Sequence, residues 1–544
     1  MPSSSCWLCR HTFGKHDSSD QGTLWDQRKD KDENEAAAIS KYLPVCTFKY
    51  TTSSKMDLLT TTARQYRDLL SSGQMSSVQL CQACIQQIHR HNRAGMHLNA
   101  VISIAPTEII QRQAVALDEE RKAGHLRSRL HGTPIIIKDI FPTHPDLGLP
   151  TTCEAYAFSN TSANQNCLLV ERLLSAGLII IATTNLTELC GIKAPEVPLG
   201  WSALGKQTQS PFIPSGRVED EAPCGNSMIG GSSSGSAAAV AAGFAPLAVG
   251  GETTGSLVIP ANRGGLYSLK VSPSRAPTQS AFCLSREHDS LGGMAKSAVD
   301  LRDLTNVILG NGPPSDDKKR NLEPFRVGFV DPKVWQYPDW MCPLSDTVRN
   351  ELVKRLFELA DKLESNGIVV QRDIGLSDED LEFEGESIVR RVAFSQFRQN
   401  FQDFAAGLDT SVETLQDLID FNNSHAEQAL PPPYSTQSFL IDAKNDISDP
   451  AHISKVFKHG HRESRQRLNQ AMNDHEIDLI LGPGDSGLYD LAACAAYPIG
   501  TMPLGEIEYE VGKFRPEGVC VIGREGEEER MLEFMVRSEW WKLG

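Results

Sequence analysis

The chain has 544 residues, of which 40% are hydrophobic and 22% charged, and it carries a formal net charge of −16. These proportions are typical of a globular protein with a large core. The negative charge argues against a nucleic-acid partner, because phosphate contacts need clustered Lys and Arg. Thirteen cysteines without regular spacing are expected to be reduced rather than to form a disulfide framework.

Two further observations bear on the location of the protein. The first twenty residues contain no basic segment followed by an apolar one, so no secretory signal is predicted. The strongly apolar stretches, such as GLIIIATTNL at 177–186, are about ten residues long, which is too short to span a bilayer. We therefore expect a cytoplasmic protein without a membrane span.

Residues 1–55 differ in composition from the rest. They are polar and charged without apolar periodicity, which predicts a disordered leader. Four potential zinc ligands lie in it: Cys6, Cys9, His11 and His16. The second pair lacks zinc-finger spacing, which favours a chance CxxC. Residues 56–544 are expected to form a single domain.

From residue 56 onward the pattern becomes regular. Apolar periodicity predicts two helices before residue 92, the second starting at Ser76 or Ser77. Further helices are predicted at 114–124, 167–177, 234–243 and, after a serine cap at Ser345, up to Gly367. Strands are predicted at 98–104, 133–140 with Lys138 at the end of the apolar run, 178–186, 245–251, 368–371, 477–484 and 518–523. A crossing loop is expected at 311–324. Alternating helices and strands indicate an α/β fold with a large mixed sheet covered by helices on both faces.

The most informative short segment is GGSSSGSAAAVAAG at 230–243. A flexible linker would stay polar, whereas this segment leads into a predicted helix and strand. Gly231, Ser233 and Gly235 satisfy the G-x-S-x-G pattern, but the apolar strand required before a nucleophile elbow is missing. GDSG at 484–487 is similar to a chymotrypsin-type motif but lies in an α/β context. Neither pattern identifies the site by itself.

Several short sequence motifs, taken together in their order along the chain, identify this segment better than either single pattern does. The blocks are NAVISI, GLPTT, TTNLTELCG, GGSSSGS, ETTGS, GMAKSAVDL and AYPIGTMPLG. In this order they resemble the amidase signature family over nearly the whole chain from residue 56. The resemblance implies the amidase signature fold and amide hydrolysis without a metal or cofactor. It also implies a Ser–Ser–Lys triad: Ser256 as the nucleophile that forms the acyl-enzyme, Ser232 on a cis peptide as the proton bridge, and Lys138 as the base.

These residue types suit the chemistry. A serine hydroxyl needs a positioned base, and a lysine serves as one only when neutral, which burial after an apolar strand favours. A bridging hydroxyl both accepts and donates a proton. The resemblance further implies that backbone N–H groups from Thr253 to Ser256, including Thr254 and Gly255, stabilise the oxyanion. Ser233 is assigned to the same substrate-binding set.

The chain departs from the common D-x-G-G-S-[IL]-R pattern at two positions. Thr254 replaces a glycine and Val258 replaces an arginine. A branch that resembles peptide amidases and fungal biosynthetic amidases also has E-T-x-G-S, so the implied substrate is a small carboxamide, with a role in secondary metabolism. Three alternatives remain. The same acyl-enzyme could serve acyl transfer or ester hydrolysis, the chain could be one component of a glutamine amidotransferase, or it could be a catalytically silent binding protein. The oligomeric state stays open, a homodimer included.

Overall fold

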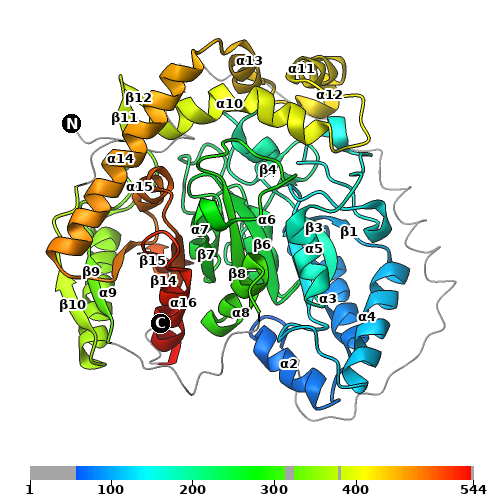
Figure 1. Cartoon of the computed structure of the whole chain (residues 1–544), viewed down its shortest axis with the longest axis horizontal. Coiled ribbons are helices and arrows are strands. Elements are labelled where there is room, and N and C mark those ends of the chain that lie inside the picture. The colour runs from blue at the N-terminus through cyan, green and yellow to red at the C-terminus, as the bar shows by residue number, and fades with distance from the viewer. Residues whose placement is uncertain (1–56, 313–323, 378–380, 541–544) are drawn as a thin grey trace. The chain divides into compact units, whose positions relative to one another are not determined.

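A mixed sheet of 11 strands runs through the computed structural model, which describes residues 57–312, 324–377 and 381–540 (Figure 1). The strands lie in the order β1-β3-β2-β6-β8-β7-β14-β15-β13-β9-β10. β3, β2 and β6 are parallel neighbours, as are β13, β9 and β10, and the strands between these groups pair antiparallel. The strand bounds are β1 Val101–Ile104, β2 Pro134–Lys138, β3 Ile179–Thr184, β6 Leu247–Glu252, β7 Tyr267–Lys270, β8 Ser290–Ala295, β9 Arg326–Phe329, β10 Val369–Arg372, β13 Leu479–Pro483, β14 Ile499–Glu510 and β15 Lys513–Ile522.

Helices surround this sheet. Their bounds are α2 Ala63–Ser71, α3 Ser77–His91, α4 Thr107–Lys122, α5 Leu168–Ser175, α6 Ser234–Ala241, α7 Val258–Arg263, α8 Ala298–Leu309, α9 Asp346–Ser365, α10 Ile388–Ala405, α11 Leu415–Ser424, α12 Ala426–Ala429, α13 Ser438–Asn445, α14 Pro450–Asp474, α15 Leu488–Ala495 and α16 Glu528–Trp540. Two short hairpins lie outside the main sheet: β4 Trp201–Ser202 with β5 Lys206–Gln207, and β11 Glu382–Phe383 with β12 Glu386–Ser387. The 3-10 turns are η1 Pro145–Leu147, η2 Tyr156–Phe158, η3 Glu188–Gly191 and η4 Pro273–Arg275.

The helices cover both faces of the sheet because successive crossovers run in opposite directions. From β2 the chain passes through α5 to β3, and from β3 it returns through α6 past β2 to β6. Crossovers between parallel strands are right-handed, so opposite directions place the two helices on opposite faces. α5 packs with α8 and α8 with α16, whereas α6 packs with α7. The α/β class with helices on both faces is thereby confirmed.

The predicted elements that carry the candidate residues agree with the structure. β2 ends on Lys138 as expected, and its Ile135, Ile136 and Ile137 are fully buried between neighbouring strands and helices. α3 begins after Ser76, whose hydroxyl accepts a hydrogen bond from the N–H of Gln79. Other boundaries were less accurate, since α4 and β15 are longer than predicted.

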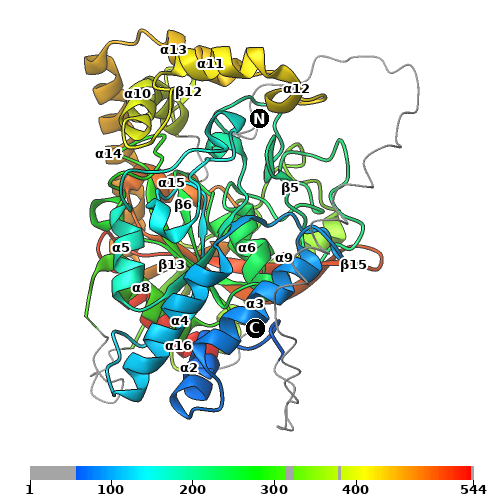
Figure 2. The same cartoon turned by 90° about the vertical axis from the view of Figure 1, so that its right-hand side faces the viewer.

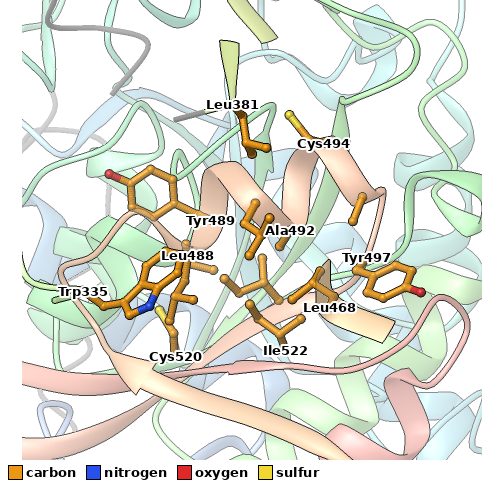
Figure 3. Packing of buried hydrophobic residues seen from close by; sticks show 14 of the residues in the cluster. Trp335, Leu381, Leu468, Leu488, Tyr489, Ala492, Cys494, Tyr497, Cys520 and Ile522 are labelled. Carbon is orange, nitrogen blue, oxygen red and sulfur yellow. The ribbon is translucent and has the colours of Figure 1, made fainter. Parts of the chain in front are cut away.

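A large hydrophobic cluster surrounds α15 in the carboxy-terminal part of the sheet (Figure 3). Leu488, Tyr489 and Ala492 of this helix pack with Trp335 and with residues of β15, among them Ile522. The Tyr489 hydroxyl also forms a hydrogen bond with that of Tyr337. α15 is therefore held rigidly, which matters below because the helix carries Asp490.

The helices α10 to α14 gather at one end of the sheet, and the hairpin turn between β14 and β15 projects beyond it (Figures 1 and 2). α10 packs against α13 and α14, and α14 packs against α15. No helix within the described ranges is long and apolar enough to cross a bilayer. The predicted leader 1–55, including its four potential zinc ligands, and most of the predicted loop 311–324 lie outside the described residues.

Candidate active site

Lys138 lies at the end of β2 and is completely buried. Its Nζ donates a hydrogen bond of 2.7 Å to the hydroxyl oxygen of Ser232 and one of 3.2 Å to the carbonyl oxygen of Gly251. No carboxylate of the described residues forms an ion pair with it. The structure thus brings together two residues that are 94 positions apart in the sequence.

Burial lowers the pKa of Lys138, because transfer of the ammonium out of water disfavours the charged form. The neighbouring side chain of Cys190, together with Asp289 and Cys153, opposes this shift of the pKa. Cys190 and Ser232 line the same pocket. Burial raises the pKa of Cys190, so the thiol is held in the uncharged form next to the lysine.

Ser232 follows two glycines with positive φ angles, 83° at Gly230 and 58° at Gly231. A Cβ atom at Gly231 would overlap the ring of Pro260, so a side chain is excluded there on both grounds. One implied feature is wrong: within the described ranges the cis peptide bond joins Pro432 and Pro433, and the bond before Ser232 is trans. The trans bond brings the Ser232 hydroxyl within 2.7 Å of the Nζ of Lys138.

Ser256 lines a pocket together with Ser232 and Cys190. Its side chain makes no hydrogen bond within the described part of the chain, and the residue keeps 9% of its surface exposed. Its carbonyl oxygen accepts a hydrogen bond of 2.9 Å from the N–H of Ser233. This backbone contact joins the turn that carries Ser232 to the loop that carries Ser256. The Ser256 hydroxyl in the pocket has no hydrogen-bond partner among the described residues.

The loop from Thr253 to Ser256 is fixed by its side chains rather than by its backbone amides. The Thr253 hydroxyl donates to Asp289 and the Thr254 hydroxyl to Asp490, both at 2.6 Å. Within the described residues, the N–H groups of these four loop residues donate no hydrogen bond. Unpaired amides in a buried loop are ready donors for an anionic oxygen.

The two departures from the common family pattern are accommodated. Thr254 does not take a positive φ, whereas Gly255 does, at 71°. Val258 is buried in the hydrophobic cluster around α15. The carboxylate of Glu252 accepts hydrogen bonds from the N–H groups of Leu257 (2.6 Å) and Val258 (2.9 Å). One carboxylate oxygen, Oε2, is thus satisfied by backbone amides at the start of α7, whereas Oε1 has no hydrogen-bond partner within the described residues and lies 3.8 Å from the Nζ of Lys270.

Ser233 and Ser486 have internal partners. The Ser233 hydroxyl donates to the carbonyl oxygen of Gly251 at 3.0 Å. The residue is fully buried and does not line the pocket. Ser486 of the GDSG motif is buried and donates to the carbonyl oxygen of Pro483. Neither serine contacts a base.

Sequence reasoning missed four residues around the pocket: Cys190, Glu252 as an acceptor of loop amides, Lys270 and Asp289. Lys270 ends β7 in the same way as Lys138 ends β2, so the isolated lysine after an apolar run was a usable signal. Cys190 and Asp289 reach the site from distant segments, and a single sequence carries no pattern for such contacts.

Comparisons with known proteins show which family the chain resembles. The Amidase family model matches residues 79–532. A protein of Arabidopsis thaliana described as a probable amidase is 24% identical over 496 residues, which are 90% of this chain and 91% of that protein. One component of the glutamyl-tRNA(Gln) amidotransferase of Chloroflexus aggregans is 33% identical over 248 residues, 45% of each chain. The solved structure of the native peptide amidase from Stenotrophomonas maltophilia matches with a TM-score of 0.73 at 25% identity, over 89% of this chain and 97% of that one.

Proposed function

This chain belongs to the amidase signature family and is an amide hydrolase, and we propose that it cleaves its substrate through an acyl-enzyme on Ser256. The observation that carries the proposal is the hydrogen bond of 2.7 Å between the fully buried Nζ of Lys138 and the hydroxyl of Ser232. A lysine whose pKa is lowered by burial is available as a neutral base at lower pH than an exposed one.

The proposed relay moves one proton along three groups. The Oγ of Ser256 attacks the amide carbon while its proton passes to Ser232, and the proton of Ser232 passes to the neutral Lys138. The tetrahedral intermediate then collapses as the relay returns a proton to the departing nitrogen, which leaves as an amine or ammonia. Water attacks the resulting ester with the same relay as base, and Ser256 leaves with the returned proton.

The reaction also requires stabilisation of the negative charge that develops on the carbonyl oxygen of the substrate. We assign its stabilisation to the backbone N–H groups from Thr253 to Ser256, which have no acceptor among the described residues. A preorganised donor of this kind contributes about 3 kcal/mol to the transition state. The Ser232 and Ser256 hydroxyls are not hydrogen-bonded to each other, and such catalytic contacts commonly tighten only when substrate binds.

The residues that line the pocket favour a substrate with an uncharged, apolar group next to the scissile amide. Phe141, Phe282 and Leu284 line it, and no Lys or Arg of the described residues does. Its acidic members are already engaged: Glu252 with the amides of α7, and Asp289 with the Thr253 hydroxyl and the Leu284 N–H. Burying a further charge without a partner is costly, so we propose a neutral amide rather than a zwitterion such as glutamine.

A fluorophosphonate probe with peptide mass mapping tests the proposal. Ser256 is expected to be phosphonylated with loss of fluoride, and Ser256→Ala is expected to abolish the labelling. Lys138→Ala should slow it strongly. Ser233→Ala is the matched control, because that hydroxyl is used inside the protein, and it should label at nearly the rate of the parent chain. Labelling of Ser233, or of Ser256→Ala at the parent rate, would contradict the assignment.

A further inference from the structure

Lys270, at the end of β7, is a second fully buried lysine beside the loop from Thr253 to Ser256. Its Nζ donates a hydrogen bond of 2.7 Å to the backbone carbonyl oxygen of Thr253. The same nitrogen lies 3.8 Å from the Oε1 of Glu252, and neither side chain is exposed to solvent. Burial lowers the pKa of Lys270, and the neighbouring carboxylate of Glu252 opposes this shift by favouring the charged amine. The Nζ of Lys270 is therefore paired with a carboxylate and directed at one particular peptide group.

That peptide group also contains the N–H of Thr254. A hydrogen bond to the carbonyl oxygen of an amide draws electron density from its nitrogen, and this strengthens the N–H as a donor. The effect is larger in a buried site, where water does not screen the charge. The Thr254 N–H has no acceptor in the described part of the chain, and its neighbours Thr253 and Ser256 line the pocket.

The surroundings keep this arrangement in place. Asp289 holds the Thr253 side chain and Asp490 holds the Thr254 side chain. Asp490 is carried by α15, which is fixed in the hydrophobic cluster of Figure 3. The peptide between the two threonines is thus anchored at both residues while Lys270 contacts its oxygen.

We infer that Lys270 is a positioning residue for the reaction: it orients and polarises the Thr253–Thr254 peptide so that the Thr254 N–H binds the oxyanion of the tetrahedral intermediate. This inference rests on the proposed function of Ser256. It assigns to Lys270 an effect on the transition state that is larger than any effect on the bound substrate. A lysine that only filled space would affect both equally.

The test compares two ligands of matched shape. 2-Phenylethylboronic acid forms a tetrahedral adduct with a nucleophilic serine and presents a negatively charged boron centre, whereas 3-phenylpropanamide remains planar. Boronate inhibition is measured in the parent chain and in Lys270→Met. Amide affinity is measured in Ser256→Ala with and without Lys270→Met. We expect the boronate inhibition constant to rise about tenfold, less than for outright loss of an oxyanion donor, and the amide dissociation constant to stay within about twofold.

Two variants provide the controls. Lys270→Arg keeps a cationic donor and should recover part of the lost boronate affinity. Lys193→Met removes another fully buried lysine, whose Nζ lies 2.7 Å from Glu188 Oε1 and which does not line the pocket. It should leave the ratio of the two affinities unchanged. Equal losses for both ligands in Lys270→Met, or no loss of boronate affinity, would overturn the inference.

A charge-balanced pair guards against misfolding, because Lys270→Met leaves Glu252 without its buried cation. The comparison is therefore repeated between Glu252→Gln and Glu252→Gln/Lys270→Met, and the same selective loss of boronate affinity is expected. Mass mapping of the boronate site separates the two levels of the argument. An adduct absent from Ser256 in the parent chain overturns the proposed function and this inference with it, whereas an adduct there with unselective losses overturns this inference alone.

Discussion

Two buried clusters at the two ends of α7 use charge in opposite ways. Near the start of the helix, Lys138 donates to Ser232 and to a backbone carbonyl, with no ion pair among the described residues. At its end, Arg263 lies 2.8 Å from Asp485, and Arg515 binds both Asp485 (3.0 Å) and Glu517 (2.7 Å). The second cluster has as many anions as cations, so its desolvation is offset by pairing.

The pKa values reflect this difference. Burial lowers the pKa of Lys138, with no carboxylate in contact to restore it. The pKa of Arg263 is raised, because the attraction of Asp485 and further neighbours outweighs burial. A lone buried amine can gain and lose a proton, whereas a paired guanidinium cannot. The comparison separates an unpaired buried lysine, whose charged form is disfavoured, from paired cations that hold segments together.

Replacement of Lys138 by methionine gives the largest expected effect. Turnover of an amide should fall about 1000-fold, because a general base is lost. The free energy of unfolding should fall by about 2 kcal/mol at most, since two hydrogen bonds are lost and an apolar group of similar length takes the place of the lysine. Amide hydrolysis and urea unfolding are measured together. Activity within tenfold of the parent chain would remove Lys138 from the relay.

The paired cluster should give the opposite result. Asp485→Asn leaves two buried guanidinium groups without their shared anion, and we expect the free energy of unfolding to fall by about 3 kcal/mol. The folded fraction should still react with the fluorophosphonate. Asp361→Asn is the control, because its pair with Arg372 is largely exposed and contributes less than about 1 kcal/mol. The free energy of unfolding of both variants is measured by urea unfolding. If it fell by similar amounts in Asp485→Asn and Asp361→Asn, the proposed difference between the clusters would be wrong.

The pH dependence of the reaction provides a third test. The lysine acts as a base when neutral, so kcat/KM should rise about tenfold per pH unit below its folded pKa and then level off. Burial lowers that pKa, so the plateau should begin below about pH 10.4, the ordinary value. The measurement is a pH–rate profile with a neutral amide. A rate that is flat from acid to neutral pH, or that falls as the pH rises over this range, would contradict a neutral lysine base.

The smallest effect concerns the pocket wall. Phe282→Ala removes an aromatic surface beside Ser256, so kcat/KM for 3-phenylpropanamide should fall about tenfold relative to acetamide. Phe357→Ala is the control, since this side chain lies on α9 and is 43% exposed. The measurement is competition kinetics with the two amides. An unchanged ratio would show that the acyl group does not contact Phe282.

The sequence predicted those parts of the site whose signal is local. β2 was recognised because three isoleucines precede Lys138, and the turn before Ser232 because paired glycines lead into an alanine helix. β8 was missed because its Gly292 is required for close approach: a Cβ there would overlap the Leu269 carbonyl of β7. Its small residues therefore carry little strand propensity.

Other parts of the fold depend on partners far away in the sequence. β14 contains Pro503 and Gly505, with a register shift between them that interrupts the alternation of apolar residues. The contacts of Cys190 with Lys138, and of Lys270 with Thr253, join segments with no common local pattern. The presence of an isolated lysine is readable from sequence, but the atom to which it donates follows only from the packing of the sheet.

The hydrogen bond between Thr254 and Asp490 has a consequence for biosynthesis, because the two residues are 236 positions apart. β7, which carries Lys270, also pairs with β14 near the end of the chain. A nascent polypeptide emerging from the ribosome therefore holds its serines and Lys138 long before the loop around Thr254 is tied down. The loop that follows β6 therefore reaches its final contacts only after Asp490 and β14 have been synthesised.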